Sequence, residues 1–324
     1  MNNKKRGKPK ILVILGPTAT GKSDVAVQLA KTFNGEIISA DSRQVYKGMD
    51  LGSGKVSRDS FPPKSYQLKA KSYFYSGVPH HLLDIVKPQT YFSVAKYKEL
   101  TEKVIEEIIK KNKTPIICGG TGFYIDSIVK NITFPEVLPN QKLRKQLEKK
   151  SVKKLFDILK KLDPKRAKNI DKNNPARLIR AIEIAKELGF VPDIKELPQK
   201  YDFIFIGLDL PDQVLKERIN IRLIKRIKAG MIKEIKNLHK NGVSWKRLES
   251  FGLEYRQTAL FLQNKIIEEK MKENLNREIW NFVKRQRTWF KTNKKIIWIN
   301  PLKKSDIIKA HKLTKIFIYE KYNY

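Results

Sequence analysis

The sequence predicts an α/β fold in which a parallel sheet carries a phosphate-binding loop and an all-helical segment interrupts the core. Two observations lead to this fold class. Segments of strand length at Ile11–Leu15 and Glu36–Ala40 enclose an amphipathic helix, and a strand–helix–strand unit of this kind gives parallel strands. Residues 135–200, by contrast, show only helical patterns.

The first strand leads directly into a phosphate-loop motif, G-x-x-x-x-G-K-[ST]. Its residues are Gly16, Pro17, Thr18, Ala19, Thr20, Gly21, Lys22 and Ser23. In such a loop, backbone N–H groups and the N-terminus of the next helix bind an anion. Lys22 adds a positive charge, and Ser23 offers a hydroxyl to Mg²⁺. We therefore expect a core similar to that of P-loop NTPases.

The second strand ends at Asp41. Because ligands of parallel sheets lie beyond the carboxyl ends of the strands, Asp41 is expected to face the same crevice as the phosphate loop. There it can hold a metal ion, act as a general base, or simply cap a helix over residues 42–47. No apolar strand ends in the acidic pattern of an ATPase, and the Asn-Lys-x-Asp motif of guanine-nucleotide proteins is absent. These absences argue against a kinase or GTPase.

The rest of the first half contains one long loop and two further core elements. Gly52–Pro79 predicts a loop that holds Lys64, Lys69, Lys71 and the aromatic string Tyr73–Tyr75. An amphipathic helix follows over Val94–Ile109, and Thr114–Cys118 predicts a third buried strand. That strand ends at Gly119-Gly120-Thr121-Gly122, and a helix is expected to begin near Phe123.

Residues 135–200 form the predicted insertion, which separates core segments 1–134 and 201–324. The insertion contains 18 Lys and Arg against 9 Asp and Glu, a net charge of +9. Helices are expected over Gln141–Leu162 and Pro175–Leu188. After the insertion we expect a strand at Asp202–Leu210, a helix from Asp212 to about His239, and mostly helix through Trp298.

The charge of the whole chain is extreme. The 324 residues carry a formal net charge of +35, with a pI of about 10.0. A polyanion such as nucleic acid is the natural partner of such a protein. A genome rich in lysine, isoleucine and asparagine codons would produce the same excess without any nucleic acid, so both explanations stay open on charge alone.

The cysteine count and the hydropathy of the chain limit the kinds of site it can form and the compartment in which we expect it. The single cysteine, Cys118, excludes a disulfide framework and a cysteine zinc site. No apolar run has the length of a membrane span. We expect a monomeric, cytoplasmic protein without a membrane partner.

Seven segments, in order, resemble one family, the tRNA dimethylallyltransferases or tRNA isopentenyltransferases (IPP transferases). The segments are GPTATGKS, ADSRQVYKGMD (Ala40–Asp50), GVPHHLLDI (Gly77–Ile85), GGTGFY (Gly119–Tyr124), NNPARLIRAIEI (Asn173–Ile184), FGLEYR (Phe251–Arg256) and KRQRTWF (Lys284–Phe290). The resemblance implies transfer of a five-carbon allylic group from dimethylallyl diphosphate to N6 of adenosine 37, beside the tRNA anticodon, with Mg²⁺ as cofactor.

The resemblance also implies roles for individual residues. Asp41, Thr121 and Lys22 would be catalytic, with Asp41 as the general base, although Thr121 can equally cap a helix. The phosphate loop and Arg222 would bind diphosphate, and Ser23 would hold Mg²⁺. Arg226 stands where the family pattern predicts an apolar residue, which leaves the orientation of its helix open. The residues that would contact tRNA are Asp41, Ser42, Arg43, Gln44, Arg144, Ala176, Arg177, Leu178, Ile179, Arg180, Arg285, Gln286 and Arg287.

Other functions remain as alternatives. An adenylate isopentenyltransferase would use free AMP, ADP or ATP, but a free nucleotide needs no basic helical insertion. A P-loop small-molecule kinase is disfavoured by the missing acidic strand end. A non-catalytic RNA-binding protein would have no use for Asp41 together with an intact Lys22-Ser23 pair.

Overall fold

The computed structural model describes residues 7–60 and 73–319. The chain divides into two compact units. The core unit comprises Met1–Asn131 and Gln199–Tyr324, and the inserted unit comprises Ile132–Pro198. Lys64, Lys69 and Lys71 of the predicted loop lie outside the described residues.

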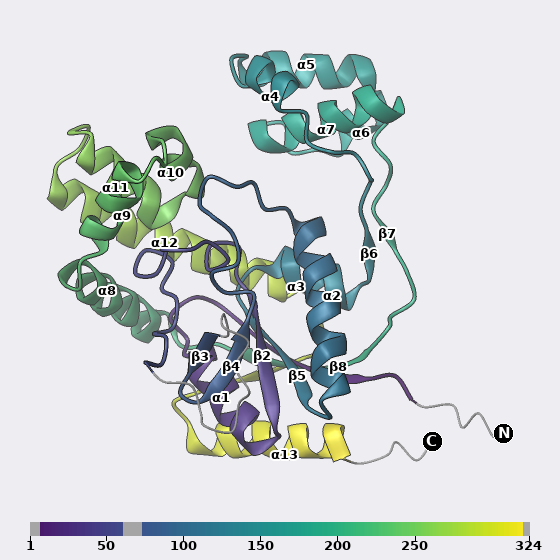
Figure 1. Cartoon of the computed structure of the whole chain (residues 1–324), viewed down its shortest axis with the longest axis vertical. Coiled ribbons are helices and arrows are strands. Elements are labelled where there is room, and N and C mark those ends of the chain that lie inside the picture. The colour runs from purple at the N-terminus through teal and green to yellow at the C-terminus, as the bar shows by residue number, and fades with distance from the viewer. Residues whose placement is uncertain (1–6, 61–72, 320–324) are drawn as a thin grey trace. The chain divides into compact units, whose positions relative to one another are not determined.

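A seven-stranded sheet forms the centre of the core unit (Figure 1), with the strand order β3-β4-β2-β5-β1-β8-β9. Its strands are β1 (Lys10–Leu15), β2 (Gly35–Ala40), β3 (Tyr73–Tyr75), β4 (Val78–His81), β5 (Thr114–Gly119), β8 (Asp202–Leu208) and β9 (Ile296–Ile299). The β3–β4 pair is antiparallel and the other pairs are parallel. The predicted α/β fold with a parallel sheet is confirmed.

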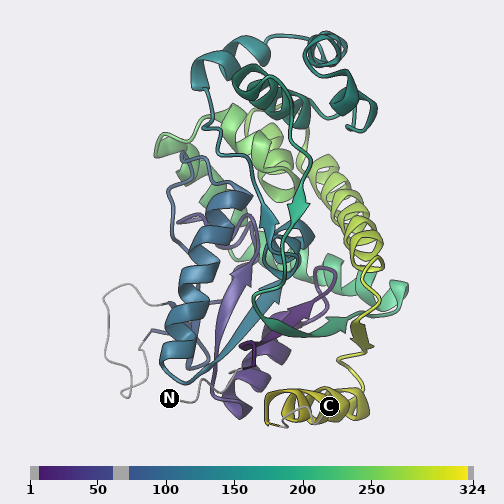
Figure 2. The same cartoon turned by 90° about the vertical axis from the view of Figure 1, so that its right-hand side faces the viewer.

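Helices cover both faces of this sheet (Figures 1 and 2). Ile11 and Val13 of β1 pack in the cluster that contains α2 (Val94–Lys110) and α3 (Gly122–Val129). Leu12 and Ile14 pack in the cluster that contains α1 (Lys22–Thr32) and α13 (Lys304–Tyr319). Because side chains alternate along a strand and both faces are covered, β1 is apolar from Ile11 to Leu15.

A helical layer completes the core unit beyond the carboxyl ends of the strands. It contains α8 (Asp212–Lys228), α9 (Met231–Lys240), α10 (Trp245–Phe251), α11 (Leu253–Leu262) and α12 (Glu268–Phe290). The prediction of one helix from Asp212 to His239 was wrong, because the chain turns at Gly230, whose φ is 103°. The stretch predicted to be mostly helix through Trp298 is mostly helix, with one strand near its end, β9, which pairs with β8. The strand predicted over Asp202–Leu210 ends at Leu208.

The inserted unit contains α4 (Gln141–Leu147), α5 (Val152–Leu162), α6 (Pro164–Lys168) and α7 (Pro175–Leu188). Asn140, Ser151, Asp163 and Asn174 cap these helices, each accepting a backbone N–H with its side chain. The prediction of one helix over Gln141–Leu162 was wrong because Ser151 begins a new helix. Two short strands, β6 (Ile132–Thr133) and β7 (Lys195–Glu196), pair antiparallel where the chain enters and leaves the unit.

His80 and His81 have structural partners. His80 is buried, its Nδ1 lies 2.9 Å from the carbonyl oxygen of Val78, and burial lowers the pKa of its ring. His81 contacts the fully buried carboxylate of Glu36 through Nε2, 2.7 Å away. Neither histidine lines the cavities described below.

Candidate active site

The phosphate loop adopts a tight turn between β1 and α1. Gly16 and Gly21 have φ values of 137° and 92°, and Ala19 has a φ of 64°. A Cβ at Gly16 would lie 2.2 Å from the carbonyl oxygen of Leu208, so only glycine fits between the loop and β8. Gly21 precedes α1, whose N-terminal N–H groups point into the loop.

Lys22 lies within this loop. Its Nζ donates a hydrogen bond to the carbonyl of Pro17 over 2.5 Å, and Thr20 donates to the same carbonyl over 2.9 Å. Burial lowers the pKa of Lys22 to about 8, and Arg222 acts in the same direction, whereas Cys118 and Asp41 act against the shift. An anion bound in the loop would therefore hold this ammonium in its charged form.

Asp41 follows β2 directly and faces the loop. Its Oδ1 accepts the backbone N–H groups of Arg43 and Gln44 over 2.8 and 3.2 Å, which fixes the carboxylate in an Asx turn. Residues 42–45 form turns, so Asp41 does not cap a helix there. The N–H of Ser42 donates to the hydroxyl of Thr121 over 3.1 Å, which joins the end of β2 to the end of β5. Thr121 precedes α3 but makes no side-chain cap.

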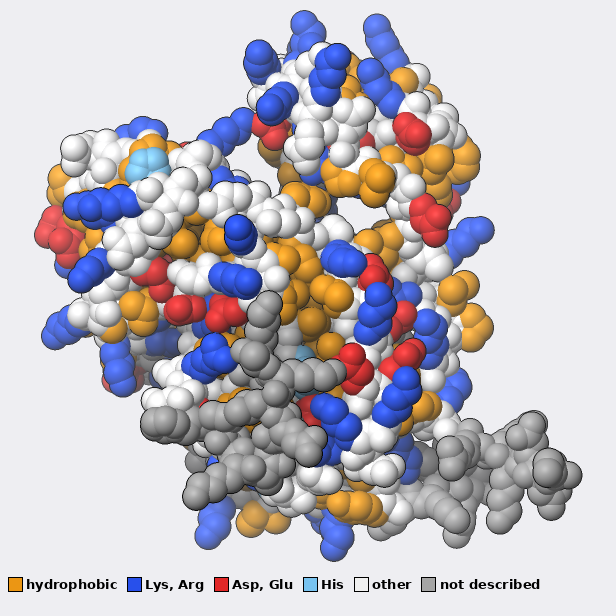
Figure 3. All heavy atoms as spheres, in the orientation of Figure 1, with side chains coloured by type: hydrophobic (Ala, Val, Ile, Leu, Met, Phe, Trp, Pro, Cys, Tyr) orange, Lys and Arg blue, Asp and Glu red, His pale blue; other side chains and the backbone are white. Residues whose placement is uncertain are grey.

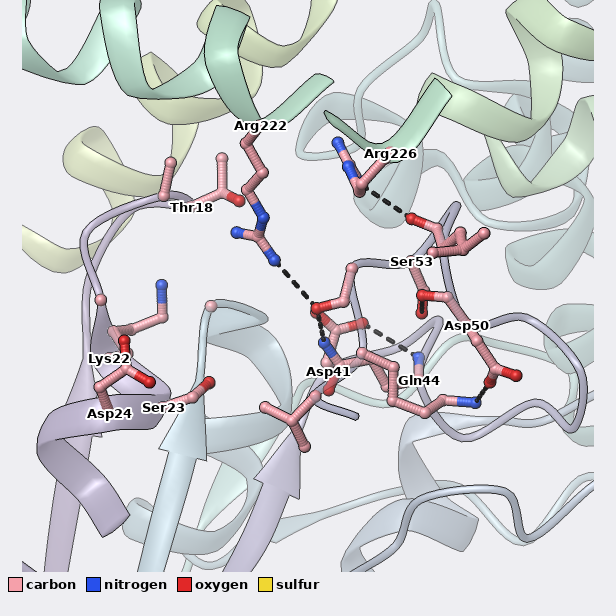
Figure 4. A pocket seen from close by; sticks show the side chains of 18 of the residues that line it. Thr18, Lys22, Ser23, Asp24, Asp41, Gln44, Asp50, Ser53, Arg222 and Arg226 are labelled. Atoms are coloured by element: carbon pink, nitrogen blue, oxygen red, sulfur yellow. Dashed lines mark hydrogen bonds and ion pairs between the residues drawn. The ribbon is translucent and has the colours of Figure 1, made fainter. Parts of the chain in front are cut away.

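Two neighbouring cavities meet at Asp41. The first, about 810 Å³, is lined by the phosphate loop residues Thr18, Ala19, Gly21, Lys22 and Ser23 together with Gln44. The second, about 610 Å³, is lined by Ser42, Arg43, Thr121 and Arg285 among others. The residues that line both are Thr18, Asp41, Ser53, Arg222, Arg226 and Phe282. Figure 4 shows Lys22 and Ser23 on one side of the first cavity and Asp41 with Gln44 on the other.

Three arginines of α8 face these cavities at intervals of four residues. Arg222 donates from Nη2 to the carbonyl of Gly54 over 2.9 Å (Figure 4). Arg226 donates to the carbonyl of Leu51 over 3.1 Å and pairs with Glu254 over 2.7 Å. Arg218 donates from Nε to the carbonyl of Ala19 over 3.0 Å. Since residues spaced by four share a helix face, this spacing was the signal that could have identified Arg218 and Arg226.

The segment Asp50–Gly54 forms one wall of the first cavity. The carboxylate of Glu234 accepts the N–H groups of Asp50, Leu51 and Gly52 over 3.0, 2.6 and 3.1 Å. Burial raises the pKa of Glu234, although these N–H groups act in the opposite direction. The cavity wall is thus fixed from α9, a contact that no local sequence pattern indicated.

Three residues of α12, Arg285, Gln286 and Arg287, were predicted to contact tRNA, and two of them bond to other parts of the core unit. Gln286 is 5% exposed and bonds to the phosphate loop and to Gly120. Arg287 pairs with Asp209 through two bonds of 2.9 Å and with Asp212. Asp209 follows β8, so an acidic residue does end a strand, and Arg287 neutralises it. Gln286 and Arg287 were predicted to contact tRNA; in the structure both side chains are engaged in these protein contacts, whereas Arg285 lines the second cavity.

The predicted residues of the inserted unit have mixed positions. Leu178 and Ile179 are buried in its core. Arg144 pairs with the buried Glu183 over 2.6 Å, and Arg180 donates to the carbonyl of Val137. Ala176 and Arg177 are exposed at the start of α7. Lysines on α4 and α5 are also exposed, and Figure 3 shows cationic side chains gathered over these helices.

Oxygen donors for a cation lie in the first cavity. Ser23, Asp24 and Asp41 line it (Figure 4). Among the described residues there is no group of three or more His, Cys, Asp or Glu that could hold a metal ion. A site with so few ligands suits Mg²⁺, which keeps several waters and binds through one or two carboxylates together with substrate phosphates. None of the helices in the described ranges is long and apolar enough to cross a membrane.

Comparisons with known proteins agree with this architecture. The sequence model of the IPP transferase family matches residues 44–293, and the isopentenyl transferase model matches residues 9–65. The chain is 43% identical to tRNA dimethylallyltransferase 2 of Treponema denticola, over 89% of this chain and 95% of that protein.

Solved structures give the same result. The full-length tRNA isopentenylpyrophosphate transferase of Bacillus halodurans is 33% identical, with a TM-score of 0.69 over 96% of this chain and 97% of that chain. A eukaryotic dimethylallyltransferase acting on tRNA, 24% identical, shares the fold with a TM-score of 0.75 over 96% of this chain and 79% of that chain.

Proposed function

The chain belongs to the IPP transferase family, and from that membership we propose that it transfers the dimethylallyl group of dimethylallyl diphosphate to N6 of adenosine 37 in the anticodon loop of tRNA. The family is enzymatic and its named members act on tRNA. The observation that carries the proposal is the position of Asp41 at the junction of two cavities, one of which contains the phosphate loop.

The first cavity supports the donor half of the reaction. Backbone N–H groups of the phosphate loop, Lys22 and Arg222 would bind the diphosphate, and their charges oppose the negative charge that grows as the allylic C–O bond breaks. Mg²⁺, held by Ser23 and the diphosphate oxygens, would supply further neutralisation of the leaving group.

The second cavity supports the acceptor half. Adenosine must leave the base stack to reach a buried donor, and contacts of the flipped base offset that cost. Ser42, Arg43, Thr121 and Arg285 line the space into which the base would enter. As the C–N bond forms and the C–O bond breaks, the proton on N6 passes to the Asp41 carboxylate and diphosphate leaves.

The remaining partners follow from the same proposal. The basic inserted unit would bind the backbone of the anticodon stem-loop, with Ala176 and Arg177 at the exposed start of α7. We propose that the protein acts as a monomer, because the phosphate loop, Asp41 and Thr121 all belong to the same chain. We place it in the cytoplasm, where tRNA is modified.

A transfer assay tests the proposal. The full-length protein is incubated with labelled dimethylallyl diphosphate, Mg²⁺ and an anticodon stem-loop that carries adenosine 37. We expect label in the RNA, and no label when guanosine replaces that adenosine. Transfer to AMP but not to the stem-loop would contradict the proposal and indicate an adenylate isopentenyltransferase instead.

A further inference from the structure

The phosphate loop is held from outside by two side chains that belong to different helices. The side-chain oxygen of Gln286, on α12, accepts the backbone N–H of Thr18 over 2.9 Å. The Nε of Arg218, on α8, donates to the carbonyl of Ala19 over 3.0 Å. Both contacts bridge parts of the chain that are far apart in sequence, and both side chains lie outside the motif Gly16–Ser23.

These two bonds flank a strained residue. Ala19 has a φ of 64°, in the left-handed region that a residue with a Cβ avoids. One bond is made immediately before Ala19 and the other at its own carbonyl. The surrounding side chains thus hold the loop in a conformation that Ala19 alone would not favour.

Gln286 makes a second contact on the opposite side of its amide. Its Nε2 donates to the carbonyl of Gly120 over 2.9 Å. A Cβ at Gly120 would lie 2.3 Å from Nε2, so the absence of a side chain at this position admits the amide. Gly120 precedes Thr121, which binds the N–H of Ser42. One buried amide therefore joins the phosphate loop to the segment Gly119–Thr121, of which Gly119 and Gly120 line the first cavity and Thr121 lines the second.

We propose that Gln286 and Arg218 are positioning residues: together they hold the phosphate loop in its anion-binding conformation, and Gln286 fixes that loop relative to Gly119–Thr121. The inference rests on the proposed function only in taking the anion to be the diphosphate of the donor. Neither side chain is required to touch the reacting atoms.

Two variants remove the hydrogen bonds while keeping the side-chain volume or the charge. Gln286→Met keeps the buried volume but removes both hydrogen bonds, and Arg218→Lys keeps the charge but removes the Nε donor. Thr288→Ala is the control on α12, because the Thr288 side chain is exposed and its hydroxyl donates to the carbonyl of Lys284 in the same helix. Calorimetry with inorganic pyrophosphate measures the affinity of the phosphate loop for its anion. Steady-state kinetics with a stem-loop as acceptor measures KM for the donor.

We expect both variants to weaken pyrophosphate binding and to raise the donor KM by about tenfold, the scale of one lost buried hydrogen bond. The Kd for the stem-loop should stay within twofold of wild type, and Thr288→Ala should behave as wild type. Unchanged pyrophosphate binding in both variants would overturn the inference. If Gln286→Met fails to fold, Arg218→Lys, on a half-buried side chain, carries the same test.

A second-site change distinguishes loop positioning from a general loss of stability. Glycine adopts a φ of +64° freely, so Ala19→Gly introduced into either variant should restore most of the lost pyrophosphate affinity. Failure of that rescue would contradict the role assigned to Ala19 and overturn the inference. If wild type transfers no dimethylallyl group while the variants still lose pyrophosphate affinity, the proposed function fails and this inference stands.

Discussion

The hydroxyl of Tyr255 donates a hydrogen bond to the carboxylate of Glu234 over 3.1 Å, directly beside the three backbone N–H groups of residues 50–52 that the same carboxylate accepts. A Cβ at Gly52 would lie 2.6 Å from the Tyr255 ring, so the cavity wall also packs tightly on this pair. Arg222 hydrogen-bonds to the same wall, at the carbonyl of Gly54.

Glu234→Ala should therefore destabilise the fold. It leaves three N–H groups and a hydroxyl without their acceptor, and we expect the free energy of unfolding to fall by about 2–3 kcal/mol. Denaturant unfolding checks this value. Lys233→Ala is the matched control, since Lys233 is the exposed neighbour. Equal unfolding curves for the two variants would show that the wall does not depend on Glu234.

Asp41→Asn keeps the side-chain oxygen that forms the Asx turn but removes the base. We expect kcat to fall by about 10²–10⁴-fold, the usual contribution of a general base. The Kd values for pyrophosphate and for the stem-loop should stay within a few-fold of wild type. Asp202→Asn, at the opposite end of the sheet, is the control. A kcat close to wild type would remove Asp41 from the chemistry.

The pH dependence of kcat/KM for the donor should follow the titration of Lys22. Its pKa of about 8 in the free protein means that the ammonium is present below pH 8 and is lost above it. Because the ammonium attracts the diphosphate, kcat/KM for the donor should decline as pH rises through about 8. Lys22→Arg stays charged across this range, so its profile should be flat there, whatever its absolute rate. A wild-type profile that is flat to pH 9.5 would be inconsistent with this assignment.

Removal of Mg²⁺ should separate activity from stability. The proposed reaction uses Mg²⁺ at the diphosphate, so EDTA should abolish transfer. Within residues 7–60 and 73–319 no group of three or more His, Cys, Asp or Glu could hold a metal ion, so EDTA should leave Tm unchanged. Thermal unfolding with and without EDTA, beside the transfer assay, checks both parts. A Tm that falls on chelation would indicate a structural metal ion in the fold.

The excess of positive charge has two explanations that salt can separate. If the inserted unit binds RNA backbone, replacing Lys149, Lys150, Lys153 and Lys154 by Gln should reduce the slope of log Kd against log salt by about 0.7–0.9 for each lost phosphate contact. The control replaces Lys304, Lys309, Lys312 and Lys315 of α13, which are also exposed. Equal slopes in the two quadruple variants would favour codon composition over a binding surface.

The fold was largely predictable because its signals are local. An apolar strand, the glycines of the phosphate loop and an amphipathic helix follow one another over a short stretch, and Gly189 ends α7 where expected. The strand β9 escaped prediction because four residues that follow a long helix and a short turn carry too little periodicity. The break between α4 and α5 depends on one serine hydroxyl, which an unbroken amphipathic pattern conceals.

Within the candidate site, the phosphate loop, Asp41 and Thr121 were predictable because they follow strand ends, whereas Arg222 and Arg285 lie on helices and were indicated by the family resemblance. Asp41 and Thr121 come to the cavities by topology alone. Gln286 was taken for an RNA-facing residue because cations and aromatics surround it. Its spacing from Val283 and Phe290 places it on the buried face of α12, and that signal was available. Glu234 had no such signal, because the three backbone N–H groups that it accepts lie about 180 residues away in the sequence.

The short ladder of β6 and β7 brings the two ends of the inserted unit together. Ile132 pairs with Glu196 and Thr133 with Lys195, so the segment between them leaves and returns at adjacent points. None of the residues that line the two cavities belongs to residues 132–198, so a change in the length or sequence of this segment would leave the strand order and the cavity lining unaltered.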